Sequence, residues 1–554
     1  MKAKIWLLLL TLAMAAAVGF AAEGLPWWSY PWTESFRSAS TASLLDDDLD
    51  IMLDPARMTS IEGYRLYTQL SNIFDKNEEV FGEHMNNNYY MIGGCGPIKD
   101  FGKLGLIYDY NFNRSNDTTR TNATSIDYSG SIPISREVDD QTGYSGVQTQ
   151  DTHWWLGFGK EMGFGKAGVL FYHLGRYNKT QPADERNMKE EIQLTDLVTN
   201  QLESMSTLEN SYTEDYIQNV WGGALSFWRP MTDKLDLGLA LGLNAYMANE
   251  YDTLLHHYEY TNPAAGGNSI VANRKEYWDI IPHDHVGSEI NVRLAGVWKW
   301  SDNVTTRTDV AFTTLSGSRD DGKMSNVYDS SAVFVLPTGT RSYVINSTEE
   351  APAVHQEDSY SALEFFSKTT AHLGEKVVLG MGLGFGSYKR DYLTSYAGTY
   401  NQSQIYNDGE PMVWGDYILY VNANADYKEN YTEAMKILVA PVGLEFKLTD
   451  NFVIRLGARH NFIFRDTTDN VSQIYTNPVV TQINPNTNDT IQGVTFDPYD
   501  NENAVYQSGK RSWNETYYTY GAGWTISEHL QLDFMGYAAL TDLHHWKLSA
   551  VIKF

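Results

Sequence analysis

Apolar and polar residues alternate with a period of two along several segments of this chain, and this pattern constrains the fold more than any other feature. The last segment places Trp546, Leu548, Ala550, Ile552 and Phe554 on one face and Lys547, Ser549 and Lys553 on the other. The same alternation runs through 235–244, 290–300 and 452–465. A helix, with 3.6 residues per turn, cannot separate such residues into two faces. Alternating runs of about ten residues match a tilted β-strand that crosses a membrane.

Short and long connections alternate between these segments. We expect tight turns at seven places: 99–103, 163–165, 232–234, 301–303, 374–376, 449–451 and 527–529. The widest connections between the turns are rich in Asn, Thr, Ser and Asp, and they cover 115–150, 178–216, 251–287, 317–357, 391–432 and 467–511. Two shorter connections lie at 75–88 and 541–545. This asymmetry is typical of outer-membrane barrels, which have short periplasmic turns and long outer loops.

The sequence therefore predicts an all-β fold, a transmembrane antiparallel up-and-down β-barrel of about sixteen strands with a short N-terminal segment. Fourteen strands is the alternative, because single-chain barrels have even strand numbers and the segments 61–74 and 153–161 are weak strands. Aromatic residues near the strand ends suit the headgroup level of a bilayer. These are Tyr108, Tyr110, Trp154, Trp155, Trp228, Trp298, Trp300, Trp524 and Trp546.

The N-terminus has the pattern of a cleaved export signal. Lys2 and Lys4 precede an apolar run from Ile5 to Val18, and small residues follow near Ala21. We interpret 1–22 as a signal peptide, 23–55 as a periplasmic or lumen-filling segment and 56–554 as the barrel. No later stretch of eighteen apolar residues predicts a membrane helix.

Composition excludes several classes of function. The formal net charge of -28 argues against binding to nucleic acid or to anionic headgroups. The single cysteine, Cys95, cannot form a disulfide scaffold and is expected to be a small buried strand residue. The sequence has no G-x-S-x-G, H-E-x-x-H, P-loop or C-x-x-C-H pattern, so we expect no enzyme and no cofactor.

Two local features resemble outer-membrane protein families. The C-terminal strand, which ends in Phe554, is similar to the signal read by the barrel-assembly machinery. The stretch ASLLDDDLDIMLDPARM at 42–58 is similar to the Asp-Asp and Asn-Pro-Ala pattern before the first strand of FadL-like transporters of long-chain fatty acids and hydrocarbons. Asp47 and Asp48 match the acidic pair, and Asp54, Pro55 and Ala56 stand where Asn-Pro-Ala would. The resemblance implies a hatch motif in a transport barrel, although Asp replaces Asn and the preceding glycine-rich segment is absent.

Charged residues fall on the face of the strands that is expected to line the lumen. The basic ones are Arg293, Lys299, Arg307, Arg455, Arg459 and Arg465, and the acidic ones are Asp109, Asp236, Asp309 and Asp533. One interpretation is a basic ladder that guides an anionic solute through a narrow lumen. The other is that arginines and carboxylates pair across strands and brace the wall.

Three further patterns suggest sites. His256 and His257 lie near one end of the 251–287 segment and His283 and His285 near the other, so the histidines could meet and bind a divalent metal. Clustered loop histidines without a metal are the alternative. The segment 178–216 carries apolar residues at roughly helical spacing, which indicates an amphipathic helix over the mouth or inside the lumen. Glycines at 380, 382, 384 and 386 leave space on the wall for a hatch or a ligand, or mark a strand kink.

These observations favour an outer-membrane channel or diffusion transporter for small solutes, with hydrophobic or anionic solutes as the expected classes. The alternative is a structural or adhesive barrel whose acidic loops bind partners or cations. Expected partners are outer-membrane lipid, the assembly machinery and a small-molecule solute. The long loops should be extracellular and both termini periplasmic.

Overall fold

The structure, a computed structural model, describes most of the chain. The described residues are 34–71, 88–129, 132–180, 186–196, 201–264, 268–321, 324–336, 339–351, 354–407, 417–484, 487–491, 505–537 and 547–554. The expected signal peptide lies outside these residues. Among them, no helix is long and apolar enough to span a bilayer.

Within the described residues, three short helices precede the first strand: α2 (Phe36–Ser40), α3 (Asp48–Met52) and the 3-10 helix η2 (Arg57–Ser60). Ser35 caps α2, because its side chain accepts a hydrogen bond from the backbone of Ser38. Asp47 and Asp50 form a capping box at the start of α3. The side chain of each residue accepts a hydrogen bond from the backbone N–H of the other. The local sequence thus fixes where both helices begin.

All other regular structure in the part of the chain that the structure describes is β. The long strands are β3 (Gly102–Ser129), β4 (Ile132–Met162), β7 (Gln201–Thr232), β8 (Leu235–Ala264), β9 (Asn268–Ser301), β14 (Val377–Asn407), β15 (Tyr417–Lys447), β16 (Phe452–Ile483) and β18 (Val505–Ser527). The shorter ones are β1 (Arg65–Ser71), β2 (Asn88–Ile98), β5 (Gly165–Thr180), β6 (Arg186–Asp196), β10 (Val304–Asp321), β11 (Met324–Leu336), β12 (Gly339–Ala351), β13 (Val354–Leu373), β17 (Thr490–Ile491), β19 (Leu530–Tyr537) and β20 (Lys547–Lys553).

The strands close into a barrel of sixteen. Every neighbouring pair is antiparallel, and β1 pairs with β20 as well as with β2, which joins the two ends of the chain. β6, β11 and β12 continue the paths of β5, β10 and β13, and the two-residue β17 is an extra strand on β16. The sixteen-strand prediction is confirmed: the weak segments 61–74 and 153–161 contain β1 and part of β4.

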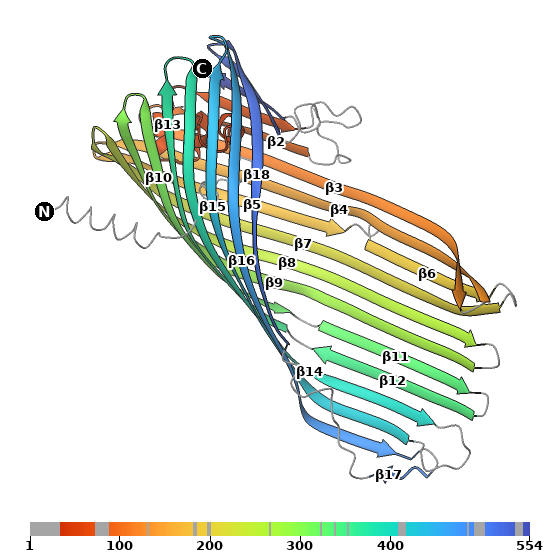
Figure 1. Cartoon of the computed structure of the whole chain (residues 1–554). Helices are drawn as coiled ribbons and strands as arrows, with labels where there is room; N and C mark the ends of the chain where they lie inside the picture. Colours follow the sequence, from red (N-terminus) through yellow and green to blue (C-terminus); the bar gives the residue numbers. More distant parts are fainter. Residues whose placement is uncertain are drawn as a thin grey trace.

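The seven expected tight turns are all confirmed. They join β2 to β3, β4 to β5, β7 to β8, β9 to β10, β13 to β14, β15 to β16 and β18 to β19. Because successive strands are antiparallel, these turns lie at one end of the barrel, where the C-terminus also lies (Figure 1).

The prediction of long loops is largely wrong, because most of these segments are β-strand. β3, β4, β7, β8, β9 and β14 to β16 each contain 28 to 34 residues, and they remain paired well beyond the shorter β1, β2, β19 and β20 (Figure 1). The predicted helix in 178–216 is also wrong, because residues 186–196 form β6 and residues from 201 onward form β7, and the two strands pair. Polar residues on both faces remove the apolar alternation, so the sequence of these extensions resembles that of loops.

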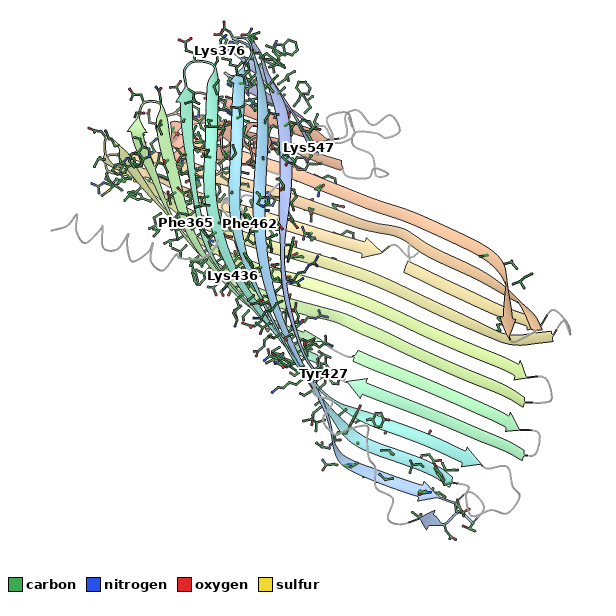
Figure 2. The ribbon with its side chains drawn as sticks, in the orientation of Figure 1. Phe365, Lys376, Tyr427, Lys436, Phe462 and Lys547 are labelled. Carbon is green, nitrogen blue, oxygen red and sulfur yellow. The ribbon has the colours of Figure 1, made fainter. Side chains whose placement is uncertain are left out.

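The alternation decides which face of the wall is apolar. Leu241, Ile290, Leu294, Leu456 and Phe464 point outward and are about half exposed, whereas Asn291, Arg293, Arg455 and Asn461 from the intervening positions are buried inside. Figure 2 shows Phe365 and Phe462 on this wall. Trp298, Trp300 and Trp524 are exposed, as expected for a girdle, but Trp155 and Trp228 are buried inside and do not belong to one.

Candidate functional site: a hatch inside the barrel

Residues 34–61, called the hatch below, lie inside the barrel near the end that carries the tight turns (Figure 1). The hatch contacts strands that include β1, β3, β4, β5, β7, β10, β13, β14, β15, β16, β18 and β19. These strands are distributed around the whole ring, so a single segment can reach all of them only from the lumen.

Glycines on the wall make room for the hatch backbone. A Cβ atom at Gly380 would lie 2.7 Å from Leu44 Cβ, and one at Gly521 would lie 2.7 Å from Ser40 Cβ. Gly168 and Gly443 face the hatch at similarly short range, against Ala56 and Thr41. Because real Cβ contacts are never this short, larger side chains here would displace the hatch. The space expected from the glycine face around Gly380 and Gly382 is therefore occupied by hatch residues.

One side of the hatch is apolar. Leu49, Met52, Leu53, Met58 and Ile61 are buried and pack in one cluster with the inner face of the strands from β1 to β8. The wall residues of this cluster are Tyr67, Tyr89, Met91, Cys95, Ile107, Trp155, Leu170, Tyr172, Ala224, Ala240 and Val551. Hydrophobic burial therefore holds the hatch to half of the ring.

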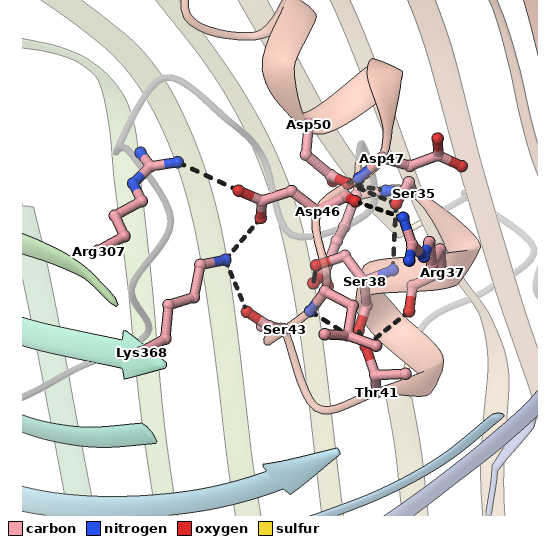
Figure 3. Close-up of polar contacts among 12 residues, drawn as sticks. Ser35, Arg37, Ser38, Thr41, Ser43, Asp46, Asp47, Asp50, Arg307 and Lys368 are labelled. Atoms are coloured by element: carbon pink, nitrogen blue, oxygen red, sulfur yellow. Dashed lines mark hydrogen bonds and ion pairs between the residues drawn. The ribbon is translucent and has the colours of Figure 1, made fainter. Parts of the chain in front are cut away.

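The opposite side of the hatch is held by ion pairs. The carboxylate of Asp46 lies 2.5 Å from Lys368 Nζ on β13 and 3.3 Å from Arg307 Nη1 on β10 (Figure 3). The same lysine donates a 3.1 Å hydrogen bond to the carbonyl of Ser43. Although burial alone would raise it, Lys368 and Arg307 hold the pKa of Asp46 well below its usual range. Asp46 is therefore ionised, and its ion pairs connect the hatch to the wall.

A second group of charges lies at β15, β16 and β19. Arg37 of the hatch makes two hydrogen bonds to the Glu445 carboxylate, at 2.9 and 3.0 Å. Arg455 donates to the same carboxylate at 2.8 Å and to Asp533 at 2.5 Å. Two guanidinium groups and two carboxylates thus form a chain from the hatch to β19, and this geometry favours charge-assisted hydrogen bonds.

The hatch motif makes specific contacts. Asp54 accepts a 2.6 Å hydrogen bond from Trp228 Nε1, and the backbone N–H of Ala56 donates to Ser226 Oγ at 3.0 Å. The backbone of Pro55 lies against Gly159 and Gly168. Asp48 pairs with Arg65 at the start of β1, at 2.8 Å, while Asp47 caps α3. All five residues of the motif therefore contact the wall or order the hatch itself.

The charged residues expected to line the pore do lie on the inner face, mostly in ion pairs. Asp309 accepts hydrogen bonds from both Arg293, at 2.6 Å, and Arg307, at 2.9 Å. Lys299 lies 3.2 Å from Asp236, Arg465 lies 2.5 Å from Glu433, and Arg459 donates to Asn461 at 3.1 Å. These contacts support the interpretation that the arginines brace the wall.

The structure does not bring the two histidine groups together. On β9 the partner of His256 is Glu276, seven residues from His283, which corresponds to about 23 Å along a strand. His257 pairs with Lys275 and His285 with Ala248. The side chains of all four histidines lie outside the described ones. Within the described part of the chain, no three His, Cys, Asp or Glu side chains are grouped to hold a metal ion.

Sequence reasoning missed Asp46, Lys368, Glu445 and Trp228 as site residues. Asp46 directly precedes the acidic pair Asp47 and Asp48 in the sequence. Lys368 falls on the positions of β13 that face the lumen. The position of each residue along its segment could therefore have identified both. Glu445 and Trp228 belong to strands far away in sequence, and only strand pairing shows that they face the hatch.

No protein-family profile matches this sequence, and neither does any curated protein. Solved structures are similar at low TM-score. The Pseudomonas putida toluene transporter TodX has a TM-score of 0.34 and 9% identity, covering 96% of this chain and 98% of its own. A Pseudomonas aeruginosa FadL homologue has a TM-score of 0.27 and 9% identity, with 97% and 100% covered. The Ralstonia pickettii toluene transporter TbuX has a TM-score of 0.27 and 10% identity, with 95% and 98% covered.

Proposed function

We propose that this protein is an outer-membrane channel or diffusion transporter for small solutes, and that its hatch closes the lumen until it moves. The observation that carries the proposal is that residues 34–61 contact strands on every side of the ring from the inside. Polar contacts hold one side of the hatch, and polar contacts can exchange with water more easily than a buried core can. This arrangement would allow the hatch to leave the wall and open the lumen.

The outer surface of the barrel supports a membrane location. Its outward side chains are large and apolar over many strands, as a surface against lipid requires, and the barrel leaves no unpaired sheet edge between β20 and β1. We infer that the tight turns and both termini are periplasmic. A tag inserted beside Asn488 should then be labelled on intact cells, and labelling only after the outer membrane is broken would reverse this orientation.

Planar-bilayer conductance tests the closed-hatch proposal. Asp46→Ala removes the carboxylate shared by Lys368 and Arg307, so it should raise the open probability or conductance above that of the unmodified protein. Asp450→Ala is the matched control, because Asp450 is a fully exposed acidic residue in the turn between β15 and β16. Equal conductance in all three folded proteins would overturn the gating role of the hatch.

The alternative, a structural or adhesive barrel, is favoured by a different observation. Strands of up to 34 residues extend far beyond the roughly ten residues that a crossing needs, and they form a continuous surface outside the barrel. Folded protein that stays silent in the bilayer with Asp46→Ala, and that still binds a surface partner, would support this alternative.

A further inference from the structure

Tyrosines form a regular series on the inner face of β14 and its neighbours. Tyr388, Tyr392, Tyr396 and Tyr400 stand four residues apart on β14. They share the parity of Gly380 and Gly382, which face Leu44 of the hatch, and the pairing of β14 with β15 keeps one register throughout. All four therefore point to the lumen side. We call these four, with Tyr427 and Tyr431 of β15 and Tyr475 of β16, the tyrosine track.

The rings of the track are paired across strands. Tyr396 stacks on Tyr427 with ring centres 4.8 Å apart and planes at 8°, and Tyr392 lies 6.0 Å from Tyr431. Tyr400 lies 4.9 Å from Tyr475. These rings are half-buried. Steps of four residues on a strand are about 13 Å apart, so the track offers a row of aromatic surfaces to an extended solute.

Polar and charged groups flank the steps at Tyr388, Tyr392 and Tyr396. Tyr388 donates to Glu364 at 3.2 Å and Tyr427 donates to Glu429 at 3.0 Å. Arg390 pairs with Asp358 at 2.8 Å and lies 4.4 Å from the centre of the Tyr392 ring. Arg465 pairs with Glu433. These contacts comprise four carboxylates and two guanidinium groups, and Asp469, which pairs with Tyr431 across the strands, adds a fifth carboxylate.

This combination favours a neutral, hydroxyl-rich solute over a hydrocarbon or an anion. A hydrocarbon would cover ion pairs and hydroxyl groups without replacing the hydrogen bonds that water gives them, which is costly. An anion would meet an excess of carboxylates. A neutral carbohydrate has apolar C–H faces that pack on rings and hydroxyl edges that exchange hydrogen bonds with carboxylates and guanidinium groups.

The rings of the track are partly exposed. Two hollows of about 630 and 590 Å³ on the same strands are lined mostly by residues of the opposite parity, so they lie on the outer face and are separate from the track. Tyr427 lies well away from the barrel end that holds the hatch (Figure 2), so a solute can reach the track while the hatch is closed.

We propose that the tyrosine track binds a linear neutral oligosaccharide. This inference rests on the proposed channel function and names its solute class. Sugar rings stack on Tyr392, Tyr396 and their cross-strand partners, and the hydroxyl groups hydrogen-bond to the flanking carboxylates and arginines. Because the steps are about 13 Å apart, a chain that spans two steps binds more tightly than a single sugar.

Isothermal titration of the detergent-solubilised full chain with maltohexaose and with cellohexaose tests this proposal. At least one hexaose should bind, and glucose should bind much more weakly. Tyr396→Ala should weaken binding about tenfold, equivalent to ~1.4 kcal/mol, whereas Tyr396→Phe keeps the ring and most of the affinity. Tyr420→Ala is the matched control, because Tyr420 lies on β15 with the opposite parity and is exposed.

Three outcomes overturn the proposal. The first is that neither hexaose gives a binding heat with folded protein. The second is that hexaose binding is unchanged by Tyr396→Ala. The third is that hexadecanoate binds instead of the hexaoses and loses affinity in this variant. Binding is read without ion flow, so these outcomes are distinct from failure of the channel proposal, which appears as unchanged conductance in Asp46→Ala.

Discussion

The carboxylate of Asp54 in the hatch accepts a 2.6 Å hydrogen bond from the indole Nε1 of Trp228 on β7, and both side chains are buried. The guanidinium group of Arg57 lies 5.4 Å from the centre of the same indole ring. Trp228 is thus in contact with hatch residues on either side of Pro55 and Ala56. Asp54, which makes this hydrogen bond, is the residue that stands where the resemblance would place Asn.

Trp228→Phe should loosen the hatch. The change removes the donor and leaves a buried carboxylate oxygen without its partner, which costs about 1–3 kcal/mol. We expect faster proteolytic cleavage within 34–61 in the folded barrel. Asp54→Asn keeps the acceptor oxygen and should leave the cleavage rate nearly unchanged. Trp298→Phe, a change at an exposed outer tryptophan, is the control, and equal cleavage of Trp228→Phe and this control would contradict the prediction.

Acid should tighten the hatch. Burial and the neighbouring carboxylates Asp46 and Glu34 raise the pKa of Asp50 from 3.8 to about 7. The docked hatch therefore binds a proton that the released hatch gives up between about pH 4 and 7, so docking is favoured as pH falls and this contribution is lost as pH rises through 7. Asp46, whose pKa is lowered, keeps its ion pairs in this window.

The measurement is the cleavage rate within the hatch at pH 5.5 and pH 8, corrected for the protease's own pH dependence with an unfolded substrate. The unmodified protein should be cleaved more slowly at pH 5.5. Asp50→Asn, which mimics the protonated form, should show little difference between the two values. A dependence of the same size in Asp50→Asn would assign the effect to another group.

Removal of Ile552 to Phe554 should prevent closure of the barrel. Ile552 and Lys553 pair with Leu66 and Arg65 of β1, and Phe554 exchanges two backbone hydrogen bonds with Tyr64. Without them the junction of β1 and β20 loses part of a seven-residue ladder, and an open edge in lipid is costly. The truncated chain should be degraded and should lose heat-modifiable migration on a gel. Normal migration would show that the remaining ladder suffices.

Alternation and turn chemistry were enough to predict the strand count and all seven tight turns. The period-2 pattern is a local property, and it holds wherever the outward face of the wall is apolar, as at Leu241 and Leu456. It fails in the strand extensions at the end opposite the tight turns, where both faces are polar. Met188 and Ile192 accordingly fitted a helical spacing, although they pair with Asn210 and Ser206 across two strands.

The site was only partly predictable, because its partners are distant in sequence. The hatch motif could be found from a local resemblance, and the parity of Arg307 and Arg455 placed them correctly on the inner face. Their function depends on Asp46 and Glu445, which are brought close only when the ring closes. Alternation within one strand predicts which face of the sheet a residue lies on. To predict its ion-pair partner, one must also know how neighbouring strands are aligned with each other.

The buried and the exposed arginines of β16 should behave differently, and this decides between bracing and solute guidance. Arg455 has a side chain only 3% exposed and binds Glu445 and Asp533. Arg455→Gln leaves both carboxylates short of a cation, which costs about 3–5 kcal/mol for a buried pair, and it also weakens the chain to Arg37. Arg465 has a side chain 40% exposed, so Arg465→Gln should cost less than about 1 kcal/mol. Denaturant unfolding in detergent measures both.

If the arginines instead guide anions, Arg465→Gln combined with Asp46→Ala should shift the reversal potential towards cations under a salt gradient. A large stability loss at Arg455 with an unchanged reversal potential at Arg465 would establish that the arginines brace the wall.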